Sequence, residues 1–137
     1  MIKGITGMTI VDNKSRYHYF NAFDEEGEII GGAAVDVTDT MHYRYKSLCK
    51  ADNTKCGEIV YVKVDKAHRG QGIAKSLLER IIHDYKNYDL FLFVCPQDKK
   101  QEKLNSVETL TKYYEKFGFK RCENPGNVPT MIKQAEI

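Results

Sequence analysis

The chain has no tryptophan, only three prolines among its 137 residues, and no long apolar run. No stretch approaches the roughly 20 consecutive apolar residues of a membrane-spanning helix, and we expect no signal peptide because the first residues lack an apolar segment. Charge of one sign is also lacking, since 21 Lys and Arg stand against 19 Asp and Glu. We therefore expect neither a membrane partner nor a nucleic acid, because dedicated nucleic-acid binders carry a strong basic excess.

Cysteine is scarce as well, and no Cys-x-x-Cys pair occurs among the four, which are Cys49, Cys56, Cys95 and Cys122. A chain of this length with 42% hydrophobic residues can bury a core without disulfides. We expect reduced thiols in a cytoplasmic protein, with no metal site. A disulfide between Cys49 and Cys56 stays open as the alternative.

The length fits one compact domain, residues 1–137, without internal repeats or linkers. The first half favours strands, because runs of β-branched and aromatic residues are separated by turn residues. The second and third of these runs flank the turn-like segment 24–27 and are expected to pair as an antiparallel hairpin. The expected strands are residues 8–11, 16–23 and 28–37. Residues 38–57 receive no assignment.

The second half changes period. Residues 58–64 form an apolar strand pattern, and the apolar residues of 73–85 recur on one helical face. Residues 90–94 are continuously apolar, as in a strand buried on both faces, and residues 104–117 predict a second helix that stops at Gly118. Two short strands, residues 119–122 and 130–134, are expected to follow. Strands outnumber helices, and the fold class is α+β or mixed α/β with a parallel βαβ unit.

The segment Arg69-Gly70-Gln71-Gly72-Ile73-Ala74 lies between a predicted strand and a predicted helix. Two glycines let the backbone turn tightly and approach a ligand closely. The helix that follows has unpaired N–H groups and the positive end of its dipole at the loop, which suits phosphate or pyrophosphate. The Walker A pattern is absent, and so is the third glycine of the dinucleotide fingerprint.

In this context Arg69-x-x-Gly72-x-Ala74 resembles the Arg/Gln-x-x-Gly-x-Gly/Ala signature of the GNAT superfamily of N-acetyltransferases. The segment 113–119, Tyr-Tyr-Glu-Lys-Phe-Gly-Phe, is similar to the family's Tyr-Glu-Lys-Leu-Gly-Phe segment. The resemblance spans about residues 58–122. It implies a central mixed, splayed sheet flanked by two main helices. The N-terminal helical region would be reduced, since only residues 12–15 separate the first two predicted strands.

The resemblance implies acetyl-CoA as co-substrate, without a metal. The family's pantetheine contacts match Val62, Lys63 and Val64, and its pyrophosphate contacts match Arg69, Gly70, Gln71, Gly72, Ile73 and Ala74. A family asparagine that contacts the cofactor falls at Val107 here. Asn105 is the expected substitute, although an N-terminal helix cap explains Asn105 equally well.

Tyr114 matches the family tyrosine that protonates the departing thiolate, with Tyr113 as its substitute if the register shifts by one. Glu58 lies eleven residues before Arg69, the offset of the general base in the histone-acetylating branch. The alternatives are a core aromatic at position 114 and an exposed strand-edge glutamate at position 58. His68 is a weaker candidate for the base, and Cys95 is expected to be structural because no histidine is placed to activate it.

The resemblance predicts direct transfer of an acetyl group to a primary amine. A protein or peptide lysine or N-terminus is favoured over a small amine, because the reduced N-terminal region leaves the acceptor side open. The alternative function is a catalytically weak or inactive module of the same fold that binds other proteins. The sequence leaves open whether the chain forms a homodimer.

Overall fold

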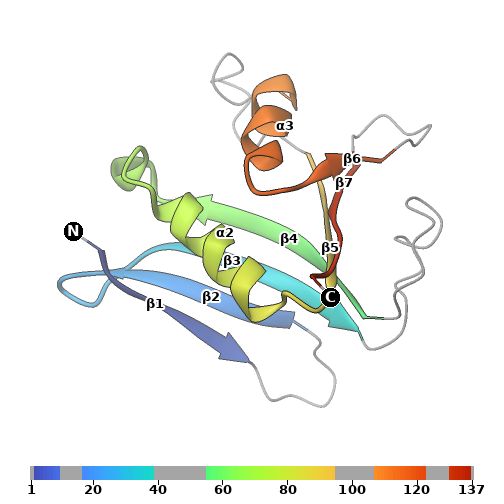
Figure 1. The fold of residues 1–137 in the computed structure, drawn as a ribbon. Coiled ribbons are helices and arrows are strands. Elements are labelled where there is room, and N and C mark those ends of the chain that lie inside the picture. Colours follow the sequence, from blue (N-terminus) through green and yellow to red (C-terminus); the bar gives the residue numbers. More distant parts are fainter. Residues whose placement is uncertain (1, 10–16, 39–54, 95–106, 123–129, 137) are drawn as a thin grey trace.

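The computed structural model describes residues 2–9, 17–38, 55–94, 107–122 and 130–136. Within these ranges the chain forms a seven-stranded sheet, two α-helices and one short 3-10 helix (Figure 1). The elements are β1 (Ile2–Thr9), β2 (Tyr17–Asp24), β3 (Ile29–Thr38), β4 (Cys56–Val64), η1 (Lys66–His68), α2 (Ile73–Asp84), β5 (Asp89–Phe93), α3 (Val107–Glu115), β6 (Lys120–Arg121) and β7 (Thr130–Lys133).

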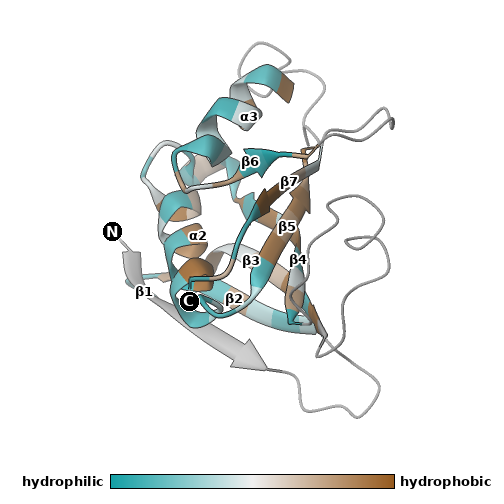
Figure 2. Cartoon of the chain, turned by 45° about the vertical axis from the view of Figure 1, so that its right-hand side comes forward, coloured by the Kyte–Doolittle hydropathy of each residue, from teal (hydrophilic) through white to brown (hydrophobic). Residues whose placement is uncertain are grey.

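The strands lie in the order β1-β2-β3-β4-β5-β7-β6. All neighbours are antiparallel except β4 and β5, which are parallel and joined by α2. The predicted mixed sheet and βαβ unit are therefore confirmed, and so is the hairpin of β2 and β3. Strand β5 is buried along nearly its whole length, as its continuous apolar sequence predicts (Figure 2).

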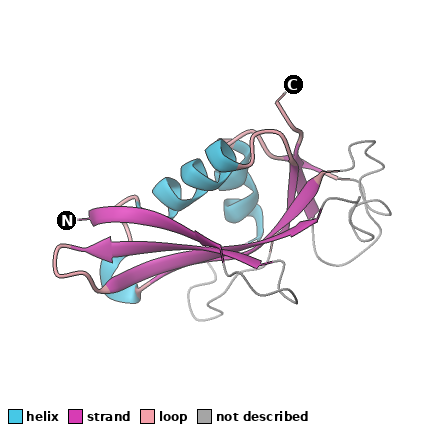
Figure 3. Ribbon diagram, turned by 90° about the horizontal axis from the view of Figure 1, so that it is seen from below, coloured by secondary structure: helices cyan, strands magenta, loops and turns pink. Residues whose placement is uncertain are grey.

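Helix α2 lies along one face of the sheet formed by β1–β4 (Figure 3). Its apolar face buries Ile73, Leu77, Leu78 and Ile81 in the main hydrophobic core. Side chains of β2, β3 and β4 that point to the same face complete this core, among them Phe20, Val35 and Ile59. We call this face of the sheet the α2 face and the other the opposite face.

Some predicted boundaries differ from the observed ones. Strand β1 begins at Ile2 rather than at residue 8, because Gly4 and Gly7 interrupt the apolar pattern on which the prediction depended. Helix α2 ends at Asp84, with Tyr85 as its C-cap. Helix α3 is described from Val107 onward, so the predicted cap at Asn105 lies outside the described residues.

The cysteines differ from expectation. Cys56 is free and buried, so the alternative disulfide between Cys49 and Cys56 is wrong. Cys122 is disulfide-bonded, and its partner lies outside the described residues. The prediction of four reduced thiols is thus wrong for Cys122, and the cytoplasmic location that it supported stays a prediction without that support. No helix in the described part of the chain is long and apolar enough to cross a membrane.

Candidate cofactor and acceptor site

Strands β4 and β5 pair over a short distance and then separate. Their parallel register joins Cys56 to Asp89, Gly57 to Leu90 and Glu58 to Phe91. Strand β4 continues beyond this point beside β3, as far as the pair of Gly31 with Val64. Residues 59–64 of β4 therefore lie beside β3 but not beside β5, and the two strands splay apart (Figure 1).

A β-bulge lies just beyond the start of this splay. Val35 pairs with Ile59 and Ala34 pairs with Tyr61, which leaves Val60 as the extra residue of β4. The side chain of Val60 is 43% exposed, although its neighbours in the strand include the buried Ile59. A bulge bends its strand and redirects side chains, and bulges are common beside active sites.

The glycine-containing loop follows β4 and leads into α2. Gly70 and Gly72 have φ angles of +83° and +81°, which favour glycine, and no heavy atom lies within 4 Å of the position of a Cβ at either residue. Gly72 is the N-cap of α2, and its carbonyl accepts a hydrogen bond from Ser76 at 3.0 Å. Buried Ile73 anchors the start of the helix, so the exposed loop presents the helix N-terminus to solvent.

The charges around this N-terminus suit an anion. The Nε of Arg69 donates to the carbonyl of Val64 at 3.1 Å, which connects the loop to the last residue of β4. Lys66 and Lys75 are also exposed near the loop, and the first turn of α2 contains no acidic residue. A phosphate group placed here would meet helix N–H groups and positive side chains together.

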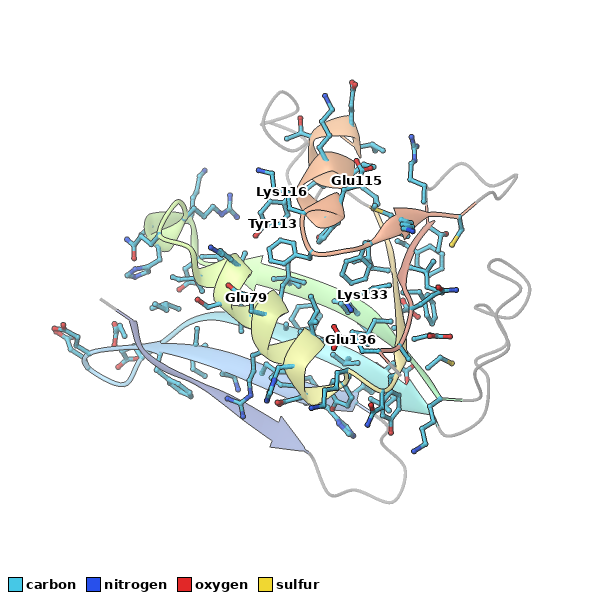
Figure 4. All side chains as sticks on the ribbon, viewed as in Figure 1. Glu79, Tyr113, Glu115, Lys116, Lys133 and Glu136 are labelled. Atoms are coloured by element: carbon cyan, nitrogen blue, oxygen red, sulfur yellow. The ribbon has the colours of Figure 1, made fainter. Side chains whose placement is uncertain are left out.

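The two tyrosines of α3 have different surroundings. Tyr114 packs against Phe119 and Tyr113, with ring centroids 6.2 and 5.6 Å apart. Burial raises the pKa of Tyr114, and the nearby Tyr113 hydroxyl adds to the effect. Tyr113 extends from α3 toward Glu79 of α2 (Figure 4), and burial followed by the negative charge of Glu79 raises its pKa. Both phenols therefore stay protonated at neutral pH, as a proton donor to a thiolate must.

Glu58 is the last residue of β4 that pairs with β5. It is only 8% exposed, so the alternative of an exposed strand-edge glutamate is wrong. Its neighbours Gly57 and Ile59 point into the α2 face, where Ile59 belongs to the main core and a Cβ on Gly57 would meet Val35. Side chains alternate along a strand, so Glu58 lies on the opposite face of the sheet, beside the start of the splay.

The structure thus brings together the predicted residues of β4, the loop and α2. Val62 and Val64 pack partly against the core, and Lys63 is exposed with its Nζ 5.2 Å from the centre of the Tyr61 ring. Asn105 and Cys95 lie outside the described residues.

The sequence prediction missed Asp36, a buried acid on β3 directly across from Glu58. The available signal was an acidic residue inside the otherwise apolar segment Ala-Val-Asp-Val.

Comparison with known proteins agrees with this architecture. A family model described as an acetyltransferase (GNAT) domain matches residues 15–121. Among curated protein sequences, none is significantly similar to this chain. The crystal structure of PH1933 from Pyrococcus horikoshii is similar, with 25% identity and a TM-score of 0.63 over 87% of this chain and 66% of that one.

Two further solved structures share the fold. PaiA N-acetyltransferase from Thermoplasma acidophilum, in complex with coenzyme A, has 19% identity and a TM-score of 0.56 over 87% of this chain and 61% of that one. Arabidopsis thaliana NAA60, in complex with a bisubstrate analogue, has 13% identity and a TM-score of 0.61 over 90% and 79%. The chain therefore spans about two thirds or less of the length of two of these three proteins.

Because the family model covers well over half of the chain, the chain belongs to the GNAT acetyltransferase family, a class of enzymes that use acetyl-CoA as acetyl donor. The splayed mixed sheet with two main helices, predicted from the resemblance, is confirmed.

Proposed function

We propose that the chain transfers the acetyl group of acetyl-CoA to a primary amine by direct attack of the amine on the thioester. The observation that carries this proposal is the end of the β4–β5 pairing at Glu58, while β4 runs on to Val64 and leads into the open N-terminus of α2. An extended ligand with an anionic end can follow this edge and place its anion at the helix.

In this proposal the pantetheine arm lies along Val62, Lys63 and Val64 in the splay. The pyrophosphate is held by the loop from Arg69 to Ala74, which offers helix N–H groups and the Arg69 guanidinium. Gly70 and Gly72 leave open space at the positions of their missing Cβ atoms, so a phosphate can approach the backbone. Asn105, which lies outside the described residues, remains a candidate contact.

The chemistry requires a base for the amine and an acid for the thiolate. Glu58 takes one proton from the ammonium form of the acceptor, directly or through water. The neutral amine then attacks the carbonyl carbon, so a C–N bond forms and the C–S bond breaks, and Tyr114 protonates the sulfur. Of the three protons on R–NH₃⁺, one passes to Glu58 and then to solvent, one replaces the Tyr114 proton delivered to coenzyme A, and one stays on the amide.

For the acceptor, an amine on a protein or peptide is the proposed class, at a lysine or an N-terminus. Strand β1 ends at Thr9 and β2 begins at Tyr17. Residues 10–16 are too few to form the two helices that line the acceptor pocket in other members of the family. A groove that admits a polypeptide fits this short connection better than a closed pocket for a metabolite does.

The test is release of the coenzyme A thiol from acetyl-CoA, with and without amines. The amines are a lysine peptide with a blocked N-terminus, a lysine-free peptide with a free N-terminus, and a small diamine. Amine-dependent release with acetylated product in mass spectra is the expected result. Protein that binds acetyl-CoA but shows no amine-dependent release with any of them would favour the non-catalytic module instead.

A further inference from the structure

Three tyrosines lie together on the opposite face of the sheet. Both α-helices of the described residues pack on the α2 face (Figure 3). Because Phe20 and Val62 also point to that face, strand alternation directs Tyr19 and Tyr61 to the opposite one. Tyr17 packs against Tyr19 with ring centroids 6.4 Å apart. Burial, followed by the neighbouring Tyr19 hydroxyl, raises the pKa of Tyr61. The three rings therefore form one group, which we call the tyrosine strip.

Lys63 lies at one end of the tyrosine strip. Its side chain is exposed, and its Nζ is 5.2 Å from the centre of the Tyr61 ring. In the register Lys63 pairs with Gly32, and Gly32 pairs with Asn21. A Cβ on Gly32 would be only 3.2 Å from Oδ1 of Asn21, so the carboxamide of Asn21 lies over this glycine. A cation and a carboxamide thus flank Gly32 on the same face, and both can donate hydrogen bonds to a carboxylate.

The other end of the tyrosine strip lies in the row of the proposed base. Glu58 pairs with Asp36 of β3, which pairs with Tyr17 of β2. Asp36 and Gly32 are four residues apart on β3. Because a strand rises about 3.3 Å per residue, the rows of Glu58 and Lys63 are about 13 Å apart. The tyrosine strip spans this distance.

The spacing suits a polypeptide. Partly exposed aromatic rings are typical of recognition surfaces, and Tyr17 is 39% exposed. An extended peptide also rises about 3.3 Å per residue. A peptide whose amine reaches Glu58 would therefore cross the tyrosines and bring a side chain four residues away to Lys63.

We infer that the tyrosine strip binds a polypeptide acceptor and that Lys63 selects an acidic side chain about four residues from the acetylated amine. This inference rests on the proposed function, in which Glu58 accepts a proton from that amine. The Lys63 ammonium binds the carboxylate, together with the Asn21 carboxamide. The side chain of Lys63 takes this role, whereas the proposed pantetheine contact uses its backbone. A small amine reaches Glu58 but not Lys63, so it lacks this contact.

The experiment is a competition between acceptor peptides that differ in one side chain. A short lysine-free peptide with a free N-terminus has Glu as its fifth residue, and its competitor has Gln there. A second pair has a blocked N-terminus and a single lysine, with Glu or Gln four residues to either side of it. Mass spectra of the acetylated products give the ratio of kcat/KM within each pair. Fluorescence anisotropy of the peptides, labelled at the C-terminus, gives the ratio of Kd on protein with bound coenzyme A.

The variants are Lys63→Gln and Lys63→Glu, with Lys55→Gln as the matched control. Lys55 is exposed just before β4, and its Nζ is 6.0 Å from the centre of the Tyr88 ring. Tyr88 packs against the main core on the α2 face and not in the tyrosine strip. Each ratio compares two peptides on one variant, so a change in acetyl-CoA affinity cancels.

Wild type and Lys55→Gln should prefer the Glu peptide by about two- to fivefold at low ionic strength, the usual range for an exposed ion pair. Lys63→Gln should show no preference. Lys63→Glu should instead prefer a peptide with Arg at the same position, because the charges are exchanged. If Lys63 only packs against Tyr61, all of these ratios should be close to one.

The inference is overturned if wild type does not discriminate between the Glu and Gln peptides, or if Lys63→Gln keeps the preference. Acetylation of both peptides at equal rates would overturn the inference and leave the proposed function intact. Failure of the proposed function looks different. In that case the peptides would bind with a Lys63-dependent preference, but no acetylated product would form.

Discussion

Glu58 of β4 pairs with Phe91 of β5, and this is the last pair that the two parallel strands form. Beyond it the Val60 bulge begins, and the strands separate around the edge of residues 59–64. Glu58 therefore lies at the start of the proposed cofactor cleft and is also the proposed base. A carboxylate at this place can reach an amine that approaches the thioester from the opposite face of the sheet.

Replacement of Glu58 by Gln should lower kcat by about a hundredfold to ten-thousandfold, the usual contribution of a positioned base. The KM for acetyl-CoA should change little, because the proposed cofactor contacts lie on the backbone of β4 and on the loop. Steady-state kinetics with the most active amine of the panel measure both parameters. Glu115→Gln, an exposed acid of α3, is the matched control and should behave as wild type. Unchanged kcat in Glu58→Gln would assign the base to another group.

The hydroxyl of Tyr114 should be needed for turnover and not for binding. Tyr114→Phe keeps the ring contact with Phe119, so the fold and the Kd for coenzyme A should be retained. The value of kcat should fall by about a hundredfold or more. Because burial raises the pKa of Tyr114 above its ordinary value of 10.0, the wild-type phenol remains a proton donor up to and beyond pH 10. The kcat profile should therefore show no alkaline decline from this group below that pH.

Tyr113→Phe is the comparison variant for Tyr114→Phe. It removes the hydroxyl of the neighbouring tyrosine, which faces Glu79 instead (Figure 4). It should retain most of the wild-type kcat. If the larger loss occurs in Tyr113→Phe, the roles of the two tyrosines are exchanged.

Acid should weaken the fold through His18. Its ring nitrogen Nδ1 contacts the Tyr85 hydroxyl between β2 and the end of α2, and burial lowers the pKa of His18 below its ordinary value of 6.5. The unfolded chain then binds a proton more readily than the folded one, so stability is full above pH 6.5 and decreases as the pH falls below it. Thermal unfolding from pH 8 to pH 5 should show a smaller decrease in His18→Gln than in wild type. His83→Gln, an exposed histidine of α2, should keep the full decrease.

Gly31 of β3 couples the sheet to the start of α2. A Cβ at this position would lie 3.0 Å from the carbonyl oxygen of Lys63 and 3.1 Å from Cγ2 of Ile73. Gly31→Ala should therefore lower the free energy of unfolding by about 1–3 kcal/mol, as overpacking does. It should also weaken acetyl-CoA binding, because the displaced groups lie on the proposed cofactor edge of β4 and at the start of α2. Chemical denaturation and calorimetry measure the two effects, and unchanged values of both would contradict this packing.

The sequence predicted α2 well because its apolar positions repeat with the period of a helix, as at Ile73, Leu77 and Ile81. It predicted β5 well because this segment is a short, continuous apolar run. The sequence also predicted that the segment from Arg69 to Ala74 leads from a strand into a helix, because glycine and charge patterns are local signals. The start of β1 was missed, because Gly4 and Gly7 carry no side chain that could show a period.

The resemblance implied a splayed sheet, but the residue at which the splay begins, the bulge and the carboxylate pair could not be predicted from the sequence. The splay depends on how far β4 pairs with β5, and the Val60 bulge on the register of β4 with β3. The sequence did not show whether Glu58 is buried, because the apolar residues next to it in β4 do not indicate which face of the strand is covered by other side chains. Only the register of β3 with β4 shows that Asp36 lies directly opposite Glu58, and the sequence alone does not fix that register.

The central claim is that acetyl-CoA occupies the splay with its pyrophosphate at the N-terminus of α2. The most direct measurement is calorimetric titration of acetyl-CoA into wild type, Arg69→Glu and Lys86→Glu, with thermal unfolding in parallel. Lys86→Glu makes the same charge change just beyond the other end of α2. Wild type and Lys86→Glu should bind, and ligand at 100 times Kd should stabilise each by about 2.7 kcal/mol.

In Arg69→Glu the affinity for acetyl-CoA should fall at least about tenfold, because an attractive charge at the pyrophosphate becomes a repulsive one. Equal binding by Arg69→Glu and wild type, or no binding by wild type at millimolar acetyl-CoA, would contradict the account.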